Sequence, residues 1–249
     1  MPSDEDISVL SLDDELTSPL DELEAVDAEP APNPEEMLVL LHAAEPGQRM
    51  LAARAFCDLQ EPRAIPDLIR LLGDVCPLIR VSAAYALGRN PSPDAVQPLI
   101  FLMAREWNGY VRKGIVWALG NCCDRRSLSP LTHALKTDIS AVRLWAASSL
   151  AQMAHLDYEA AVAALPPLIE ALRRDPVAAV RSNCAWAIGQ LCRELPSNVV
   201  YATAIDALIE ALVEDGDVGV KEDAKGALLK VGDPRGLQLA EKLEQEGII

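Results

Sequence analysis

The apolar positions of this chain recur with a helical period, and they recur in blocks. Through most of residues 35–245, apolar residues lie three and four positions apart, which is the spacing of one face of an α-helix. Within each block a basic residue, here named the anchor, precedes a stretch that in most blocks carries small residues at +3, +4 and +6 and a large aliphatic residue at +7. The anchors are Arg80, Arg112, Arg143, Arg181 and Lys221. Self-similarity of this kind is typical of stacked structural repeats.

The spacing of the anchors predicts the architecture. Successive anchors are separated by 32, 31, 38 and 40 residues, which indicates a period of about 31 with short insertions near 155–161 and 194–202. Each block predicts two helices, the first starting near a proline and the second carrying the anchor. Glycines at +8 suit close packing or a helix end; they are Gly88, Gly120 and Gly189. We therefore expect an all-α fold, a right-handed α-solenoid of about five to six helical hairpins.

The expected boundaries follow from this period. Residues 34–249 form the solenoid and residues 1–33 a separate tail. The expected units are roughly 35–60, 61–91, 92–123, 124–155, 161–193 and 202–232, followed by a cap at 233–249. The first helices are expected to start near Pro66, Pro98, Pro130 and the pair Pro166 and Pro167.

Acidic residues recur ahead of the anchors. Four stand six positions before an anchor and Asp138 stands five before; the four are Asp74, Glu106, Asp175 and Asp215. A carboxylate at this point can cap a helix or pair with the anchor of its own or the next repeat. We therefore expect the anchor arginines to be structural.

The repeated unit resembles a known family. The pattern P-L-I-x-x-L…D-x-x-x-x-V-R-x-x-A-A-x-A-L-G, followed from Pro98 to Gly120 and from Pro167 to Gly189, resembles the HEAT-like repeat of the phycobilisome-lyase type. The resemblance covers roughly residues 35–240. It implies relatives among cyanobacterial bilin lyase subunits, which work as pairs of HEAT subunits. It also implies relatives among small HEAT proteins that partner iron–sulfur assembly factors.

Charge separates the tail from the body. The formal net charge is −16, yet residues 1–45 hold fourteen Asp or Glu and no Lys or Arg, which leaves 24 acids and 22 bases for the remainder. The tail is therefore expected to be disordered, because it alternates acids with single apolar residues. The body has no concentrated basic face, so nucleic acid is not an expected partner. With no apolar run of membrane-spanning length and no basic leader, the expectation is a cytoplasmic protein that does not enter membranes.

The second helices of the blocks are expected to line the concave side of the solenoid, and this concave groove is the predicted partner-binding face. Positions +1, +2, +5 and +9 from the anchor point away from the core by helical periodicity. They carry aromatic and amide side chains, a composition typical of interaction hot spots. The predicted partner-binding residues are Tyr85, Lys113, Trp117, Asn121, Trp145, Gln152, Asn183, Trp186 and Gln190. The tail is expected to dock a partner or to compete for this face.

The sequence offers few candidate catalytic or metal-binding residues. The three histidines lie in different blocks without a cysteine or acid at metal-ligand spacing. No catalytic residue is expected, and an iron–sulfur cluster would have to use Cys122, Cys123 or Cys192. The leading hypothesis is a non-enzymatic adaptor or assembly factor that binds a partner protein, without a cofactor. The alternatives are a subunit of a bilin lyase or chromophore chaperone, and an accessory protein in iron–sulfur cluster assembly.

Overall fold

The computed structural model describes residues 32–245. The chain divides into two units, residues 1–32 and 33–249. The predicted acidic tail lies outside the described residues, apart from its last two positions. The second unit contains all of the repeats.

The described part of the second unit is helical throughout, with six helical hairpins and a final helix, and residues 32–245 contain no β-strand. The α-helices are α1 Pro34–Leu40, α2 Pro46–Ala55, α3 Ile65–Leu71, α4 Pro77–Arg89, α5 Pro93–Met103, α6 Gly109–Asn121, α7 Leu128–Thr137, α8 Ser140–Ala151, α9 Tyr158–Arg174, α10 Ala178–Arg193, α11 Val199–Glu214, α12 Val218–Val231 and α13 Pro234–Gln245. Short 3₁₀ turns η2 Pro62–Ala64, η3 Arg125–Ser127 and η4 Gln152–His155 lie between them. The all-α solenoid predicted from the period is confirmed.

The start of two first helices differs from the sequence expectation. Pro66 does lie in the first turn of α3. Helix α5, however, begins at Pro93, and α9 begins after Asp157, whose side chain accepts a hydrogen bond from Ala160 N at 2.8 Å. Pro98 and the pair at 166 and 167 therefore lie inside helices, because a capping residue further upstream sets the start.

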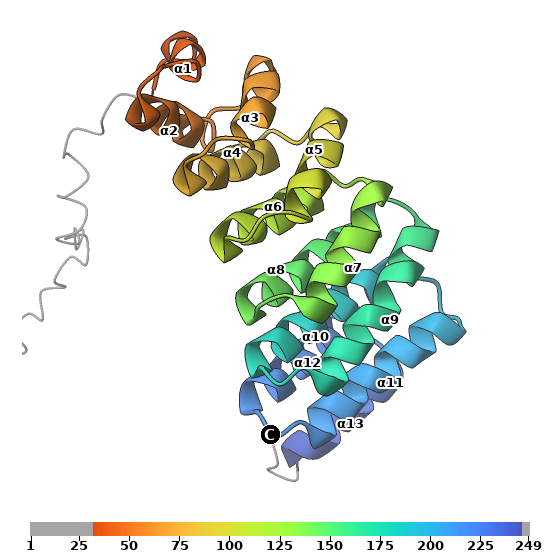
Figure 1. The fold of residues 1–249 in the computed structure, drawn as a ribbon. Helices are drawn as coiled ribbons and strands as arrows, with labels where there is room; N and C mark the ends of the chain where they lie inside the picture. Colours follow the sequence, from red (N-terminus) through yellow and green to blue (C-terminus); the bar gives the residue numbers. More distant parts are fainter. Residues whose placement is uncertain (1–31, 246–249) are drawn as a thin grey trace, which may run out of the picture. The chain divides into compact units, whose positions relative to one another are not determined.

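The helices form two layers, with the first helices of the hairpins in one and the second helices in the other (Figure 1). Successive second helices, from α2 to α12, pack against one another more extensively than successive first helices do. Small residues allow this close approach. A Cβ added to Gly120 would lie 2.7 Å from the Ser149 side chain, and one added to Gly189 would lie 2.8 Å from Ala227 Cβ. The predicted role of these glycines in tight packing is confirmed.

A ladder of ion pairs runs through the turns between the two helices of each hairpin. Each anchor arginine pairs with the acid of the following repeat rather than with the carboxylate of its own, and Arg49 of α2 takes the anchor's place in the first hairpin. The rungs are Arg49–Asp74 at 2.9 Å and Arg80–Glu106, Arg112–Asp138, Arg143–Asp175 and Arg181–Asp215 at 2.7 Å. The structural role expected of the anchors is thereby confirmed, and each rung ties one hairpin to the next.

The rung between Arg80 and Glu106 shows how the ladder is built. Arg80 donates two hydrogen bonds to the Glu106 carboxylate and two more to the backbone carbonyls of Asp74 and Val75. Glu106 also accepts a hydrogen bond from Asn108 N at 2.9 Å. Burial favours a raised pKa for Glu106, but the hydrogen bonds from Arg80 and Asn108 and the charge of Arg80 outweigh it and lower the pKa. The carboxylate is therefore held in its charged form.

Candidate binding face on the second helices

The nine predicted binding residues all come from the second helices, or in one case from the 3₁₀ turn that follows α8. Here we call the surface formed by these nine side chains the second-helix face. All nine side chains are partly buried, neither fully covered nor fully exposed. The aromatic rings therefore contribute both to packing between repeats and to the surface.

Two of the rings contact each other across neighbouring repeats. The ring centroids of Tyr85 and Trp117 are 5.4 Å apart, with the planes tilted by 47°. Trp117 also packs on Gly88, where an added Cβ would lie 2.4 Å from Trp117 Cζ3. Burial raises the pKa of Tyr85, so its hydroxyl stays protonated near neutral pH. Both rings thus pack between neighbouring repeats and stay partly exposed to solvent.

A cation continues the row of aromatic rings. The Nζ atom of Lys113, from α6, lies 5.0 Å from the ring centroid of Trp145, from α8. An ammonium over an indole is stabilised by the ring quadrupole. The structure therefore places a positive charge over the Trp145 ring.

Asn183 has a structural role in addition to its place on the face. Its side-chain amide donates to Leu144 O at 2.6 Å and to Ser148 Oγ at 2.5 Å. Both acceptors belong to α8, so Asn183 fastens α10 to the preceding repeat. A ligand could accept a hydrogen bond from Asn183 Nδ2 only by displacing one of those bonds.

Three of the predicted residues meet in one hollow between η4 and α10. This hollow has a volume of about 210 Å³, and its lining includes Gln152, Trp186 and Gln190. Sequence analysis did not identify three further lining residues, His155, Arg193 and Glu194, since they lie beyond the helical positions that define the face. An indole, an imidazole, two amides, a guanidinium and a carboxylate are thereby brought together at one point of the surface.

Burial disfavours the thiolate form of the three candidate cluster ligands, Cys122, Cys123 and Cys192. Burial raises the pKa of Cys122 and Cys123, and burial with the nearby charge of Asp233 raises the pKa of Cys192 to about 12. The thiolate is the form that attacks electrophiles and binds metals. In the part of the chain that the structure describes, no three His, Cys, Asp or Glu side chains are grouped so as to hold a metal ion.

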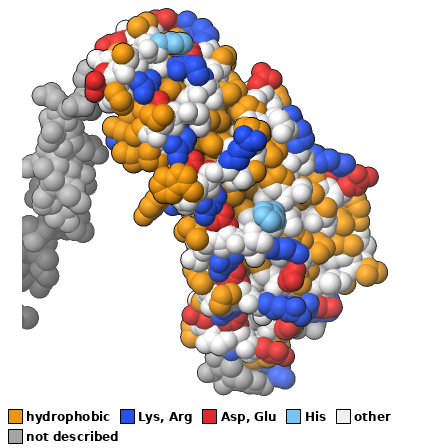
Figure 2. All heavy atoms as spheres, in the orientation of Figure 1, with side chains coloured by type: hydrophobic (Ala, Val, Ile, Leu, Met, Phe, Trp, Pro, Cys, Tyr) orange, Lys and Arg blue, Asp and Glu red, His pale blue; other side chains and the backbone are white. Residues whose placement is uncertain are grey.

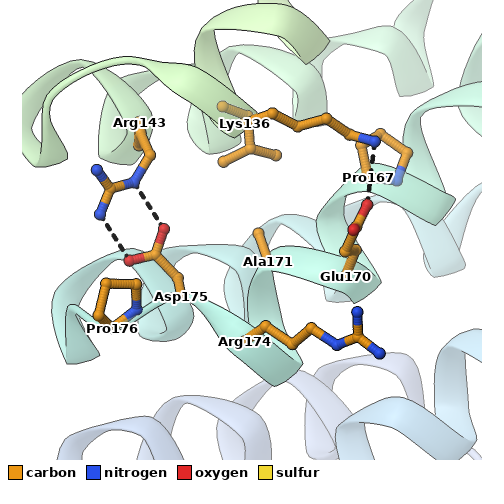
Figure 3. A pocket seen from close by; sticks show the side chains of 9 residues that line it. Lys136, Arg143, Pro167, Glu170, Ala171, Arg174, Asp175 and Pro176 are labelled. Carbon is orange, nitrogen blue, oxygen red and sulfur yellow. Dashed lines mark hydrogen bonds and ion pairs between the residues drawn. The ribbon is translucent and has the colours of Figure 1, made fainter.

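The first-helix side carries hollows that sequence analysis missed. One of about 350 Å³ lies between α7 and α9, beside the Arg143–Asp175 rung and the Lys136–Glu170 pair at 3.0 Å (Figure 3). Arg174 also lines it. Such hollows arise where successive first helices diverge, which no periodicity within one helix reveals.

The structure also exposes one tryptophan that the helical pattern left unassigned. Trp107 lies in the turn between α5 and α6, with 77% of its surface accessible to solvent.

None of the helices within residues 32–245 combines the length and apolar composition needed to cross a lipid bilayer.

Comparison with curated proteins identifies a relative of known name. The chain is 37% identical over 103 residues to the bilin biosynthesis protein RpcF of Synechococcus sp. (strain WH8020), a match that covers 41% of this chain and 48% of that protein. The chain thus spans about half the length of this curated relative. The match confirms the predicted resemblance to HEAT-like repeats of the phycobilisome-lyase type.

Solved structures show the same fold. The complex of CpcE and CpcF of phycocyanin lyase from Nostoc sp. PCC7120 matches with a TM-score of 0.59 and 23% identity, over 84% of this chain and 80% of that one. A designed armadillo repeat protein in complex with the peptide (KR)4 matches with a TM-score of 0.58 and 20% identity, over 80% of this chain and 98% of that one.

The family itself is established by the repeats. The model of HEAT repeats matches residues 34–114, 98–189 and 165–246. These three overlapping matches cover the six hairpins and α13. The chain belongs to the HEAT-repeat family.

Proposed function

We propose that this chain is one subunit of a bilin lyase, and that its second-helix face holds the bilin for transfer to a partner protein. The observation that carries the proposal is the presence of the Tyr85–Trp117 ring pair and the Lys113–Trp145 cation–ring contact on the second helices of a chain that is 37% identical over 103 residues to a bilin biosynthesis protein. The helical-repeat scaffold is common to this proposal and to the adaptor hypothesis.

The chemistry of the face suits a linear tetrapyrrole. A bilin is a flat conjugated chain of pyrrole rings that carries two propionate groups. The pyrrole rings would stack on the indole and phenol faces, and such aromatic pairs contribute roughly 0.5–1.5 kcal/mol each. Lys113 over Trp145 supplies a positive charge for one carboxylate, and Arg193 supplies a second in the hollow beside Trp186, which Glu194 also lines.

The chain would bind and orient the bilin without forming the bond itself. The thiols of Cys122, Cys123 and Cys192 have raised pKa values and are poor nucleophiles at neutral pH. The acceptor cysteine would then lie on the partner biliprotein, and the second-helix face would hold the bilin in reach of it.

The test is a titration of the purified chain with phycocyanobilin, followed by red absorption and by quenching of tryptophan fluorescence. We expect the double variant Trp117→Ala, Trp186→Ala to raise the Kd at least tenfold. The matched control is Trp107→Ala, which removes an indole outside the face and leaves the Kd unchanged. Circular dichroism checks that the double variant keeps its helices.

The adaptor hypothesis predicts a different outcome. An adaptor that binds only protein would leave the bilin spectrum unchanged, both alone and mixed with apo-phycocyanin, and that result would refute the lyase proposal. The iron–sulfur hypothesis predicts broad blue absorption after reconstitution with iron and sulfide, lost on substitution of Cys122 and Cys123.

A further inference from the structure

An unassigned apolar surface lies along the turns of three successive hairpins. We call it the turn ridge and define it by Val75, Leu78, Trp107, Tyr110 and Ile139. Trp107 and Tyr110 are each 77% exposed, Val75 is 90% exposed, and the other two are more than half exposed. Figure 2 shows hydrophobic side chains gathered over the region of α4 and α6. Exposed apolar patches of roughly 300–600 Å² on a monomer commonly mark interaction sites.

The ladder makes the turn ridge continuous. The Arg80–Glu106 rung joins the turn that carries Val75 to the turn that carries Trp107. Ile139 of the next turn packs on Gly109, where an added Cβ would lie 2.6 Å from Ile139 Cδ1. The apolar side chains therefore belong to one surface rather than to scattered turns.

The backbone beneath the two aromatic rings is fixed. Arg112 Nη1 donates to the backbone carbonyls of Trp107 at 2.9 Å and of Glu106 at 3.1 Å. Asn108 Oδ1 accepts hydrogen bonds from the backbone N–H groups of Tyr110 and Val111. A surface whose backbone is already held loses little conformational entropy when it binds. The rings are thus exposed on a rigid support.

A hollow adjoins the turn ridge between α5 and α7. Its volume is about 650 Å³, within the range of roughly 300–1,000 Å³ typical of ligand pockets. The Arg112–Asp138 rung and Ile139 lie at its edge. Its apolar lining includes Ile100, Met103, Ala104, Pro130 and Ala134. This hollow has room for a large apolar side chain of a binding partner.

The charge beside the turn ridge indicates which kind of partner this surface would bind. Of the six Lys or Arg between residues 98 and 137, four are held in ion pairs and Lys113 lies over Trp145, which leaves Arg105 to meet an incoming carboxylate. Arg105, two positions before Trp107 in sequence, is exposed, and its guanidinium lies 3.8 Å from the ring centroid of Phe101. The rung acids Glu106 and Asp138 are already paired with arginines, so they oppose an incoming carboxylate weakly.

We infer that the turn ridge and the adjoining hollow bind an acidic amphipathic segment of a partner protein. An apolar side chain of that segment fills the hollow, its apolar face covers Trp107 and Tyr110, and its carboxylates lie near Arg105. Aromatic anchors on a rigid support with a complementary charge at the rim are the features of an interface hot spot. The surface is distinct from the second-helix face, so the inference stands whether or not the chain binds a bilin.

The test uses the full chain and a synthetic helical peptide labelled with fluorescein. The peptide carries Leu or Phe at positions i, i+3, i+4 and i+7 and Glu on both flanks, and binding is measured by fluorescence anisotropy. The double variant Trp107→Ala, Tyr110→Ala is expected to raise the Kd at least tenfold. Val199→Ala, which shortens an exposed apolar side chain at the start of α11, is the matched control and leaves the Kd unchanged.

Charge and occupancy are tested with the same assay. A peptide with Lys in place of Glu is expected to bind at least tenfold more weakly, and added salt is expected to weaken the acidic peptide. Equal binding by the wild type and the double variant, or by the two peptides, overturns the inference. Two further results also overturn the inference, because each shows that something else occupies the turn ridge. A lower peptide Kd after deletion of residues 1–31 would identify the chain's own N-terminal segment as the occupant. A dimer in light scattering that the double variant abolishes would identify a second copy of the chain as the occupant.

Discussion

The substitution Glu106→Ala removes one side of the Arg80–Glu106 ion pair and leaves the other side in place. The Glu106 side chain is 2% exposed and the Arg80 side chain 10% exposed, so the pair is shielded from water. Arg80 would keep its two bonds to the backbone carbonyls of Asp74 and Val75 but would lose both bonds to the carboxylate. A buried guanidinium would then stand without a counter-charge.

The size of the loss follows from these contacts. Breaking a buried ion pair from one side typically costs about 3–5 kcal/mol. The carbonyl bonds that Arg80 retains place the loss near the low end of that range. The substitution also removes the hydrogen bond that Asn108 N donates to the Glu106 carboxylate, which adds about 1 kcal/mol to the loss. We therefore expect the free energy of unfolding to fall by about 4 kcal/mol. Glu106→Gln keeps the shape and one acceptor and should cost about half as much.

The assay is urea unfolding followed by far-UV circular dichroism. Because a repeat array can unfold in steps, amide hydrogen exchange in α4 and α6 is measured beside it and should show local loss of protection. The matched control is Glu210→Ala, which breaks the exposed Arg173–Glu210 pair and should cost no more than about 1 kcal/mol. Equal losses for Glu106→Ala and Glu210→Ala would refute the structural role assigned to the ladder.

Glycine packing, thiol burial and the ladder carboxylates each give a further expected outcome. Gly88→Ala should destabilise the chain by about 1–3 kcal/mol, because the added Cβ would meet the indole of Trp117. Gly226→Ala, in open space within α12, should instead stabilise the chain by up to about 1 kcal/mol. Thermal unfolding of the two variants shows whether each change raises or lowers the melting temperature. Iodoacetamide at pH 8 should modify Cys192 only after unfolding, as read by mass spectrometry, since its pKa is raised to about 12. Hydrogen bonds from Arg181 lower the pKa of Asp215, and those to Asp175 outweigh its burial with the same result. Both carboxylates therefore stabilise the fold fully above their ordinary pKa near 3.8, and melting temperature should fall as pH drops through their lowered values.

The binding face shows where prediction from the sequence stops. Helical periodicity placed Trp117, Trp145 and Trp186 on the solvent side of the second helices, and their partial exposure agrees with that placement. Their role in binding stays a prediction. The bonds of Asn183 to the preceding helix were not foreseeable, because the register between two helices depends on how whole repeats pack.

The sequence by itself determined the helical period, the repeat length and the recurrence of an anchor with an acid before it. These are local properties, since each helix buries one face and each turn needs its capping groups. Only the tertiary structure decided that Arg80 pairs with Glu106 of the next repeat rather than with Asp74 of its own. It also decided that Trp107 faces solvent on a fixed turn. Both outcomes depend on the stacking of hairpins about thirty residues apart, which sets distances that no single repeat contains.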